Sequence, residues 1–121
     1  MESFTKPKKI RPVNLFTVPE AIAAVSGVAE VGMVTITGDE ELNCFKLANK
    51  DNAKLASELS KAALVEVDGK PLSSQDGSVD SFWMEAHPKL RQLILTAYAE
   101  LHATEEEDQK SFLKSKKVRV A

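Results

Sequence analysis

The chain has 121 residues, of which 43% are hydrophobic and 28% are charged, and its net charge is −2. This length suits one domain, and this composition is typical of a folded globular protein and excludes a wholly disordered chain. The sequence has no run of 18 apolar residues and no apolar segment directly behind its first basic residues, so we expect neither a membrane span nor a secretory signal. The single cysteine, Cys44, excludes an internal disulfide and fits a reducing compartment such as a cytoplasm.

The charge is distributed unevenly along the chain. Residues 1–12 carry four basic residues and one acidic residue (+3), and residues 110–121 carry five basic and no acidic residues (+5), which leaves −10 for residues 13–109. We expect a basic N-terminal arm at 1–12, a single α-rich domain at 13–115 and a basic C-terminal tail at 116–121. The acidic body argues against a dedicated nucleic-acid binder, although an accessory factor that uses only its two tails stays an alternative.

The first elements after the arm are a predicted helix and a predicted strand. Thr17 and Glu20 have the spacing of a capping box, Pro19 suits a first turn, and Gly27 ends the helix. The following segment, VAEVGMVTIT, is rich in β-branched residues and predicts a strand near 31–37.

Two further helices are predicted next, as a helical hairpin. Thr37 and Glu40 repeat the capping box, and the helix that they begin runs to about Ala48, with Leu42, Phe45 and, at its end, Ala48 on one face. Asp51 can cap a second helix that ends near residue 63.

The segment 64–72, LVEVDGKPL, predicts a small β-hairpin. Its Asp68-Gly69 pair suits a type I′ turn, in which both central residues need positive φ. Pro71 has no N–H to donate, so its strand must lie at a sheet edge. The residues that follow, 73–78, have the composition of a loop.

Residues 79–101 contain the strongest helical pattern of the chain, with Pro88 in a first turn. A third Thr-x-x-Glu box, Thr104 to Glu107, predicts a last helix with few apolar residues. The predicted fold class is therefore α+β and mostly α-helical: about five helices, a short strand near 31–37 and a hairpin near 64–72.

No residue pattern predicts a catalytic site, a metal site or a cofactor. His87 and His102 lie roughly 22 Å apart along one predicted helix, so they cannot share a metal; we expect His87 to cap that helix and His102 to act as a cation at its end. Cys44 is predicted to be a small buried residue. Asp76 and Asp80 do not follow the calcium-loop order, and no nucleotide-binding or hydrolase motif is present.

A set of apolar side chains in the segment 82–101 can serve either the core or a partner, because buried and interface residues have the same apolar signature. The predicted partner-binding residues are Phe82, Trp83, Leu90, Leu93, Ile94, Tyr98 and Leu101. For Phe82 and Trp83 a place in the core beside Leu90 and Ile94 is an equal alternative.

Three segments carry a family resemblance: VTITGDEELNCFKLA, then LASELSKAALVEVDGKPL, then HPKLRQLILTAYAELHATEEEDQKSFLKS. Over about residues 31–115 the chain resembles the small tail assembly chaperones of long-tailed bacteriophages. The shared features are a T-G-D-E helix start, a V-x-V-D-G-K-P turn, and a long helix that ends in A-Y-x-x-L before an acidic run.

This resemblance implies a non-enzymatic protein of the host cytoplasm. Such a protein binds the apolar tape-measure protein, and also tail-tube subunits, and keeps them soluble until the tail polymerises; it can be a homo-oligomer. The sequence is also similar to small baseplate or hub-assembly proteins of contractile tails, which are permanent structural parts. Presence in finished particles separates the two alternatives.

Overall fold

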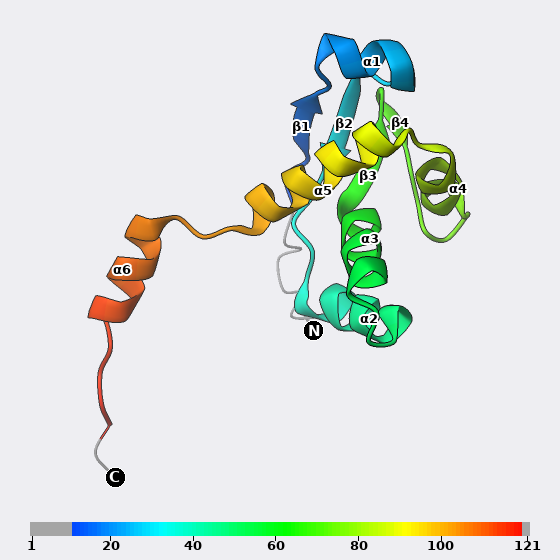
Figure 1. Cartoon of the computed structure of the whole chain (residues 1–121). Helices are drawn as coiled ribbons and strands as arrows, with labels where there is room; N and C mark the ends of the chain where they lie inside the picture. Colours follow the sequence, from blue (N-terminus) through cyan, green and yellow to red (C-terminus); the bar gives the residue numbers. More distant parts are fainter. Residues whose placement is uncertain (1–10, 120–121) are drawn as a thin grey trace, which may run out of the picture.

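A four-stranded antiparallel sheet forms one layer of the molecule, and helix α5 crosses one of its faces (Figure 1). The computed structural model describes residues 11–119; residues 1–10 of the predicted arm and residues 120–121 of the predicted tail lie outside the described residues. The strands, in their order across the sheet, are β1 (Asn14–Thr17), β2 (Glu30–Met33), β3 (Leu64–Val67) and β4 (Lys70–Pro71). The helices are α1 (Glu20–Ser26), α2 (Gly38–Ala48), α3 (Asn52–Ala63), α4 (Ser78–Glu85), α5 (Pro88–His102) and α6 (Glu106–Lys114). The predicted fold class is confirmed, with six helices in the described part where about five were expected.

Strand β1 was not predicted, and it takes a residue that was expected to begin a helix. Thr17 is the last residue of β1 and pairs with Glu30 of β2. Helix α1 follows Pro19 and has no side-chain cap, so the predicted capping box at Thr17 is wrong, because Thr17 is still part of strand β1 and the helix begins only at Glu20. Gly27 ends α1 in the left-handed conformation, with φ 73°, as predicted. The strand predicted near 31–37 is confirmed only in part, since β2 spans Glu30–Met33.

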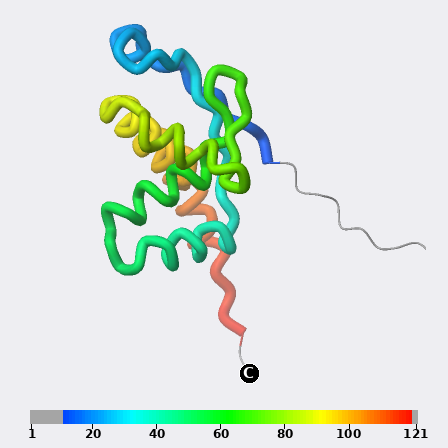
Figure 2. Tube along the Cα trace, turned by 90° about the vertical axis from the view of Figure 1, so that its right-hand side faces the viewer, coloured from blue at the N-terminus to red at the C-terminus, as the bar shows by residue number. Residues whose placement is uncertain are grey.

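The second capping box forms as predicted and begins the helical hairpin of α2 and α3 (Figure 2). The Thr37 hydroxyl accepts a hydrogen bond from the Glu40 N–H at 3.2 Å, and the Glu40 carboxylate accepts one from the Thr37 N–H at 2.9 Å. Asp51 caps α3, again as predicted. The Val34 N–H donates to the Ala63 carbonyl at 2.9 Å, so the two ends of this helical hairpin meet at the sheet.

The apolar face that was predicted for α2 is buried only in part. Cys44 and Ala48 are buried, whereas Leu42 and Phe45 are 55% and 51% exposed. The small side chains of Cys44 and Ala48 let α2 approach α3 closely, so close packing selects this face over the one with larger residues. The prediction that Cys44 is a small buried residue is confirmed, and of the predicted face of Leu42, Phe45 and Ala48 only Ala48 is buried.

The predicted hairpin at 64–72 is present as β3 and β4. Asp68 and Gly69 form its turn with φ 50° and 78°, and Pro71 lies in the edge strand β4. The Asp68 side chain also accepts hydrogen bonds from the backbone N–H groups of Ala29 and Glu30, both at 2.9 Å. The turn therefore ties the hairpin to the start of β2.

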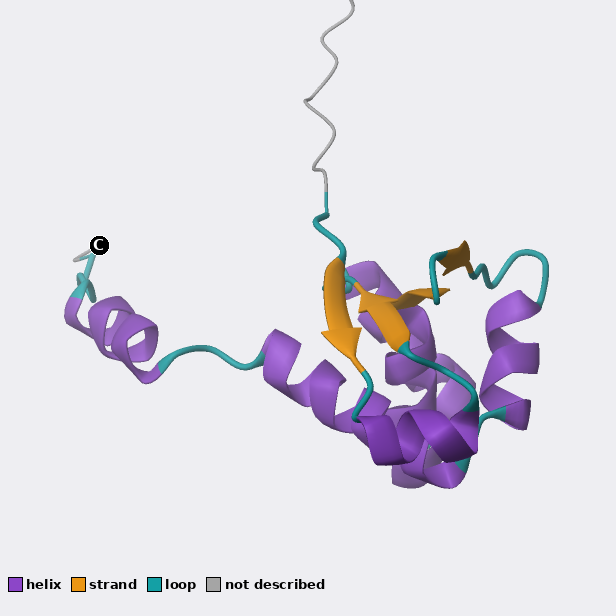
Figure 3. Ribbon diagram, turned by 90° about the horizontal axis from the view of Figure 1, so that it is seen from above, coloured by secondary structure: helices purple, strands orange, loops and turns teal. Residues whose placement is uncertain are grey.

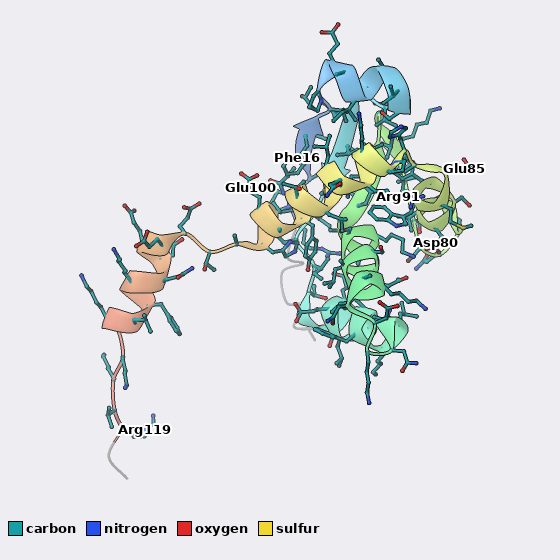
Figure 4. All side chains as sticks on the ribbon, viewed as in Figure 1. Phe16, Asp80, Glu85, Arg91, Glu100 and Arg119 are labelled. Carbon is teal, nitrogen blue, oxygen red and sulfur yellow. The ribbon has the colours of Figure 1, made fainter. Side chains whose placement is uncertain are left out.

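Residues 78–102 form two helices that meet at a sharp break. Helix α5 begins at Pro88, and His87 caps it by accepting a hydrogen bond from the Lys89 N–H at 3.1 Å, as predicted. Helix α4 is a separate element that the sequence did not distinguish. Arg91 of α5 donates to the Met84 carbonyl at 2.9 Å and lies 6.0 Å from the Trp83 ring centre, so it joins the two helices (Figure 4).

Helix α6 lies apart from the body, at the end of one extended connection (Figure 3). It has no buried residue and no side-chain cap at its start. Thr104 accepts a hydrogen bond from the Gln109 side chain at 2.7 Å and does not cap the helix, so the predicted third capping box is wrong. Among the described residues, no helix is both long enough and apolar enough to span a membrane.

Candidate partner-binding groove

An apolar groove of about 200 Å³ lies between β1 and α5. One side is formed by Phe16 of β1 and by Val18 and Pro19 directly after this strand, together with Val31 of β2. Its α5 side is formed by Leu90, Leu93, Ile94 and Ala97. Thr17, Thr96 and Glu100 are the polar residues of the lining; Figure 4 labels Phe16 and Glu100, which lie on the two sides of the groove.

The two walls follow from local sequence patterns. Side chains alternate along a strand, so Phe16 points toward α5 while Leu15, which is 57% exposed, points to the opposite face of the sheet. On α5 the apolar residues recur at spacings of three and four and form one stripe along the helix. The stripe meets the Phe16 side of β1, and the space that these side chains leave unfilled is the groove.

The predicted partner-binding residues divide between the core and the groove. Trp83, Leu90 and Ile94 are buried in the core, so in this conformation they present almost no surface to a partner. Leu90 and Ile94 nevertheless form part of the groove lining, together with the half-buried Leu93. The three other predicted residues, Phe82, Tyr98 and Leu101, are half-buried against the core and do not line the groove. The partner-binding role of the whole set stays a prediction.

Strand β1 contributes a feature that sequence reasoning missed: an edge beside the groove that no other strand within residues 11–119 pairs with. The Val18 N–H donates to the Ala29 carbonyl at 2.8 Å, and Phe16 is paired with Val31. Backbone groups alternate in direction along an antiparallel strand, so those of Leu15 and Thr17 point away from β2. The alternation of Val13, Leu15 and Thr17 with Asn14 and Phe16 was the available signal, but five residues are too few to predict a strand securely.

A second cleft, of about 380 Å³, lies among α2, α3 and the start of α4, and its charged residues are paired with one another. The Lys61 ammonium lies 2.9 Å from both Glu58 and Asp80, and Arg11 pairs with Glu40. Burial lowers the pKa of Lys61, but the hydrogen bonds to Asp80 and Glu58 outweigh burial and leave this pKa raised. The pair of Lys61 and Asp80 joins α3 to α4, and the pair of Arg11 and Glu40 joins the segment before β1 to α2. These charged residues therefore have a structural role.

Cys44 lines this second cleft but lacks the surroundings of a reactive thiol. Burial raises the pKa of its thiol, and the charges of Glu58 and Glu40 raise it further. A thiol with a raised pKa stays protonated and is a weak nucleophile. Within residues 11–119, no group of three or more histidine, cysteine and acidic side chains has an arrangement suited to a metal ion.

His102 has a different role from the predicted one. The Ile36 N–H donates to its Nε2 at 2.9 Å, so Nε2 accepts and carries no proton, and Nδ1 donates to the Tyr98 carbonyl at 2.9 Å. The ring also stacks on Tyr98, with centroids 4.2 Å apart. His102 is therefore a neutral imidazole that joins α5 to the segment before α2, because a backbone donor faces it, and the prediction of a cation is wrong.

No protein-family model, no curated protein and no solved structure matches this chain.

Proposed function

We propose that this protein is a non-enzymatic tail assembly chaperone that binds the tape-measure protein in the host cytoplasm. The observation that carries the proposal is the apolar groove beside the edge of β1, which is free of pairing among the described residues. A groove of this kind accepts an apolar segment of another protein, and the family resemblance of residues 31–115 supplies the identity of that protein. The resemblance extends the proposal to tail-tube subunits as further partners.

The partner segment binds in an extended conformation. Its backbone pairs with the outward-pointing groups of Leu15 and Thr17 and adds a strand to the sheet, which is a recurrent mode of peptide binding. Alternate side chains of the segment then point toward α5 and contact Leu93 and Thr96. Binding therefore selects segments with apolar residues at every second position.

The proposal is tested by co-expression of this protein with the tape-measure protein of the same genome, followed by co-purification. Leu93→Asp places a charge in the groove and is expected to abolish capture, whereas Met84→Asp, at an exposed apolar residue outside the groove, leaves capture unchanged. Because Leu93 also packs against the core, Thr96→Arg serves as a second groove variant at an exposed position of α5. Circular dichroism verifies the fold of each variant.

A third variant tests strand addition by itself. Leu15→Pro removes an N–H that points away from β2, so the β1–β2 pairing is kept while the free edge loses a donor. Full capture by the groove variants and by Leu15→Pro would refute the groove as the binding site. If the protein is found in finished particles, the permanent structural component replaces the chaperone.

A further inference from the structure

Helix α6 shows an apolar surface that no described element of its own chain covers. Phe112 and Leu113 are 77% and 69% exposed, and none of the residues of α6 is buried. The helix has nine residues, and an isolated helix of this length is unstable in water. A stable α6 therefore needs another surface to pack against.

Helix α2 shows a matching apolar surface. Leu42 and Phe45 are three residues apart on a helix, so they lie on one face, and each is about half exposed. The buried face of α2, at Cys44 and Ala48, is already occupied by packing within the chain. The Leu42 face is thus free, within the described residues, to receive a second helix.

The charges of α2 and α6 match when the two helices are antiparallel. Each helix has acidic residues in its first turn and basic residues at or after its last turn. For α2 these residues are Asp39, Glu40, Glu41, Lys46 and Lys50; for α6 they are Glu106, Glu107, Asp108, Lys114, Lys116 and Lys117. An antiparallel pair sets each acidic end beside a basic end, whereas a parallel pair sets like charges side by side.

The chain cannot make this antiparallel pair with its own α6. Helix α5 ends beside the start of α2, because the His102 ring accepts the Ile36 N–H at 2.9 Å. The connection from the last residue of α5, residue 102, to the first residue of α6, residue 106, spans at most about 14 Å when it is fully extended, whereas the 11 residues of α2 extend for about 16 Å. An α6 folded back on its own α2 would therefore begin near the acidic end of α2 and run parallel to it.

We propose that α6 of each copy packs antiparallel on α2 of a second copy, so that two chains exchange their C-terminal helices in a symmetric dimer. Phe112 and Leu113 of one copy then cover Leu42 and Phe45 of the other, and the same contact is made twice. The groove between β1 and α5 takes no part in this contact. The inference is independent of the tape-measure protein.

The test is a charge exchange between two full-length variants, with mass in solution measured by analytical ultracentrifugation. The native chain at about 100 µM is expected to have twice its monomer mass of 13.2 kDa. Asp39→Lys/Glu41→Lys reverses the acidic end of α2, and Lys116→Glu/Lys117→Glu reverses the basic end of α6. Each variant alone is expected to be monomeric, with a dissociation constant raised at least about tenfold. An equimolar mixture restores the dimer, because both contacts of the mixed pair are again matched.

Two controls make the result specific. Glu20→Lys/Glu85→Lys makes the same change of net charge at exposed positions on α1 and α4 and is expected to leave the dimer intact. Phe112→Ser, in a helix without buried residues, is expected to give a folded monomer. A monomeric native chain, a dimer that withstands the charge reversals, or a mixture that stays monomeric would each overturn the proposal. The proposal is also overturned if Phe112→Ser weakens capture of the tape-measure protein but does not weaken self-association.

Discussion

Gly32 is expected to tolerate alanine only when the side chain opposite it is removed. Gly32 lies in β2 and pairs with Leu15 on one side and with Glu66 on the other. A Cβ at this position would lie 2.3 Å from Cγ of Glu66 and 2.9 Å from its Cδ and Oε1. Because Cγ is close to the backbone, Glu66 would have to adopt another rotamer to make room.

The change in the free energy of unfolding caused by Gly32→Ala is the sum of two opposing effects. Introducing a methyl group into a space that is already filled costs about 1–3 kcal/mol. Alanine also reduces the entropy of the unfolded chain relative to glycine, which stabilises the fold by about 0.4–1 kcal/mol. Gly32→Ala is therefore expected to lower the free energy of unfolding by about 1–2 kcal/mol. In a Glu66→Ala background the collision is absent, and the same change becomes neutral or stabilising.

The assay is a double-mutant cycle by urea denaturation of four proteins: the native chain, the two single variants and the double variant. Equal m-values across the four proteins are required for the comparison. The expected coupling free energy between the two positions is about 1–3 kcal/mol. If Gly32→Ala costs the same in both backgrounds, the backbone itself demands glycine and the reasoning from Glu66 is refuted.

Three further predictions concern stability. Thr37→Ala should lower the free energy of unfolding by about 1 kcal/mol, because it removes the capping box at the start of α2, whereas Thr104→Ala should change it by less than about 0.5 kcal/mol in the same urea titration. Ile94→Ala should cost about 2–5 kcal/mol, since the side chain is fully buried, and a cost under about 1 kcal/mol would contradict its place in the core. The pKa of Lys61 is raised by folding, so its ion pairs stabilise the fold at neutral pH and this contribution is lost as the pH rises through the folded-state pKa. The stability difference between the native chain and Lys61→Met, followed by denaturation from pH 7 to 11, should therefore be constant to about pH 10 and then decrease.

Local signals in the sequence predicted the elements whose conformation neighbouring residues decide. The Thr37 capping box, the Asp51 cap, the Asp68-Gly69 turn and the edge position of Pro71 all depend on residues within a few positions of one another. Strand β1 could not be predicted in this way, because its conformation depends on pairing with a strand about 16 residues away, and that pairing also removed Thr17 from its expected cap.

Residue periodicity identified α2, α3 and α5, but it did not separate α4 from α5, and it did not predict the surface that α2 presents. On α2 the predicted face of Leu42, Phe45 and Ala48 is buried only at Ala48, and the small Cys44 is buried beside it. On α5 the stripe that includes Leu90, Leu93 and Ile94 was recognised, and its division between core and groove depends on the unpredicted β1. The candidate site was therefore predicted on the α5 side and missed on the β1 side.

The hydrogen bond between Val34 and Ala63 makes the α2–α3 hairpin an insertion in a simple β-meander. The strands follow one another in chain order, and the 28 residues between Val34 and Ala63 leave the sheet and return to it where the backbones of these two residues are hydrogen-bonded. The entropic cost of such an excursion grows only slowly with its length, by about 0.6 kcal/mol for each doubling. The α2–α3 hairpin, with its surface at Leu42 and Phe45, can therefore change in length and composition during evolution without displacing the strand edge at Leu15. The two surfaces can diversify separately.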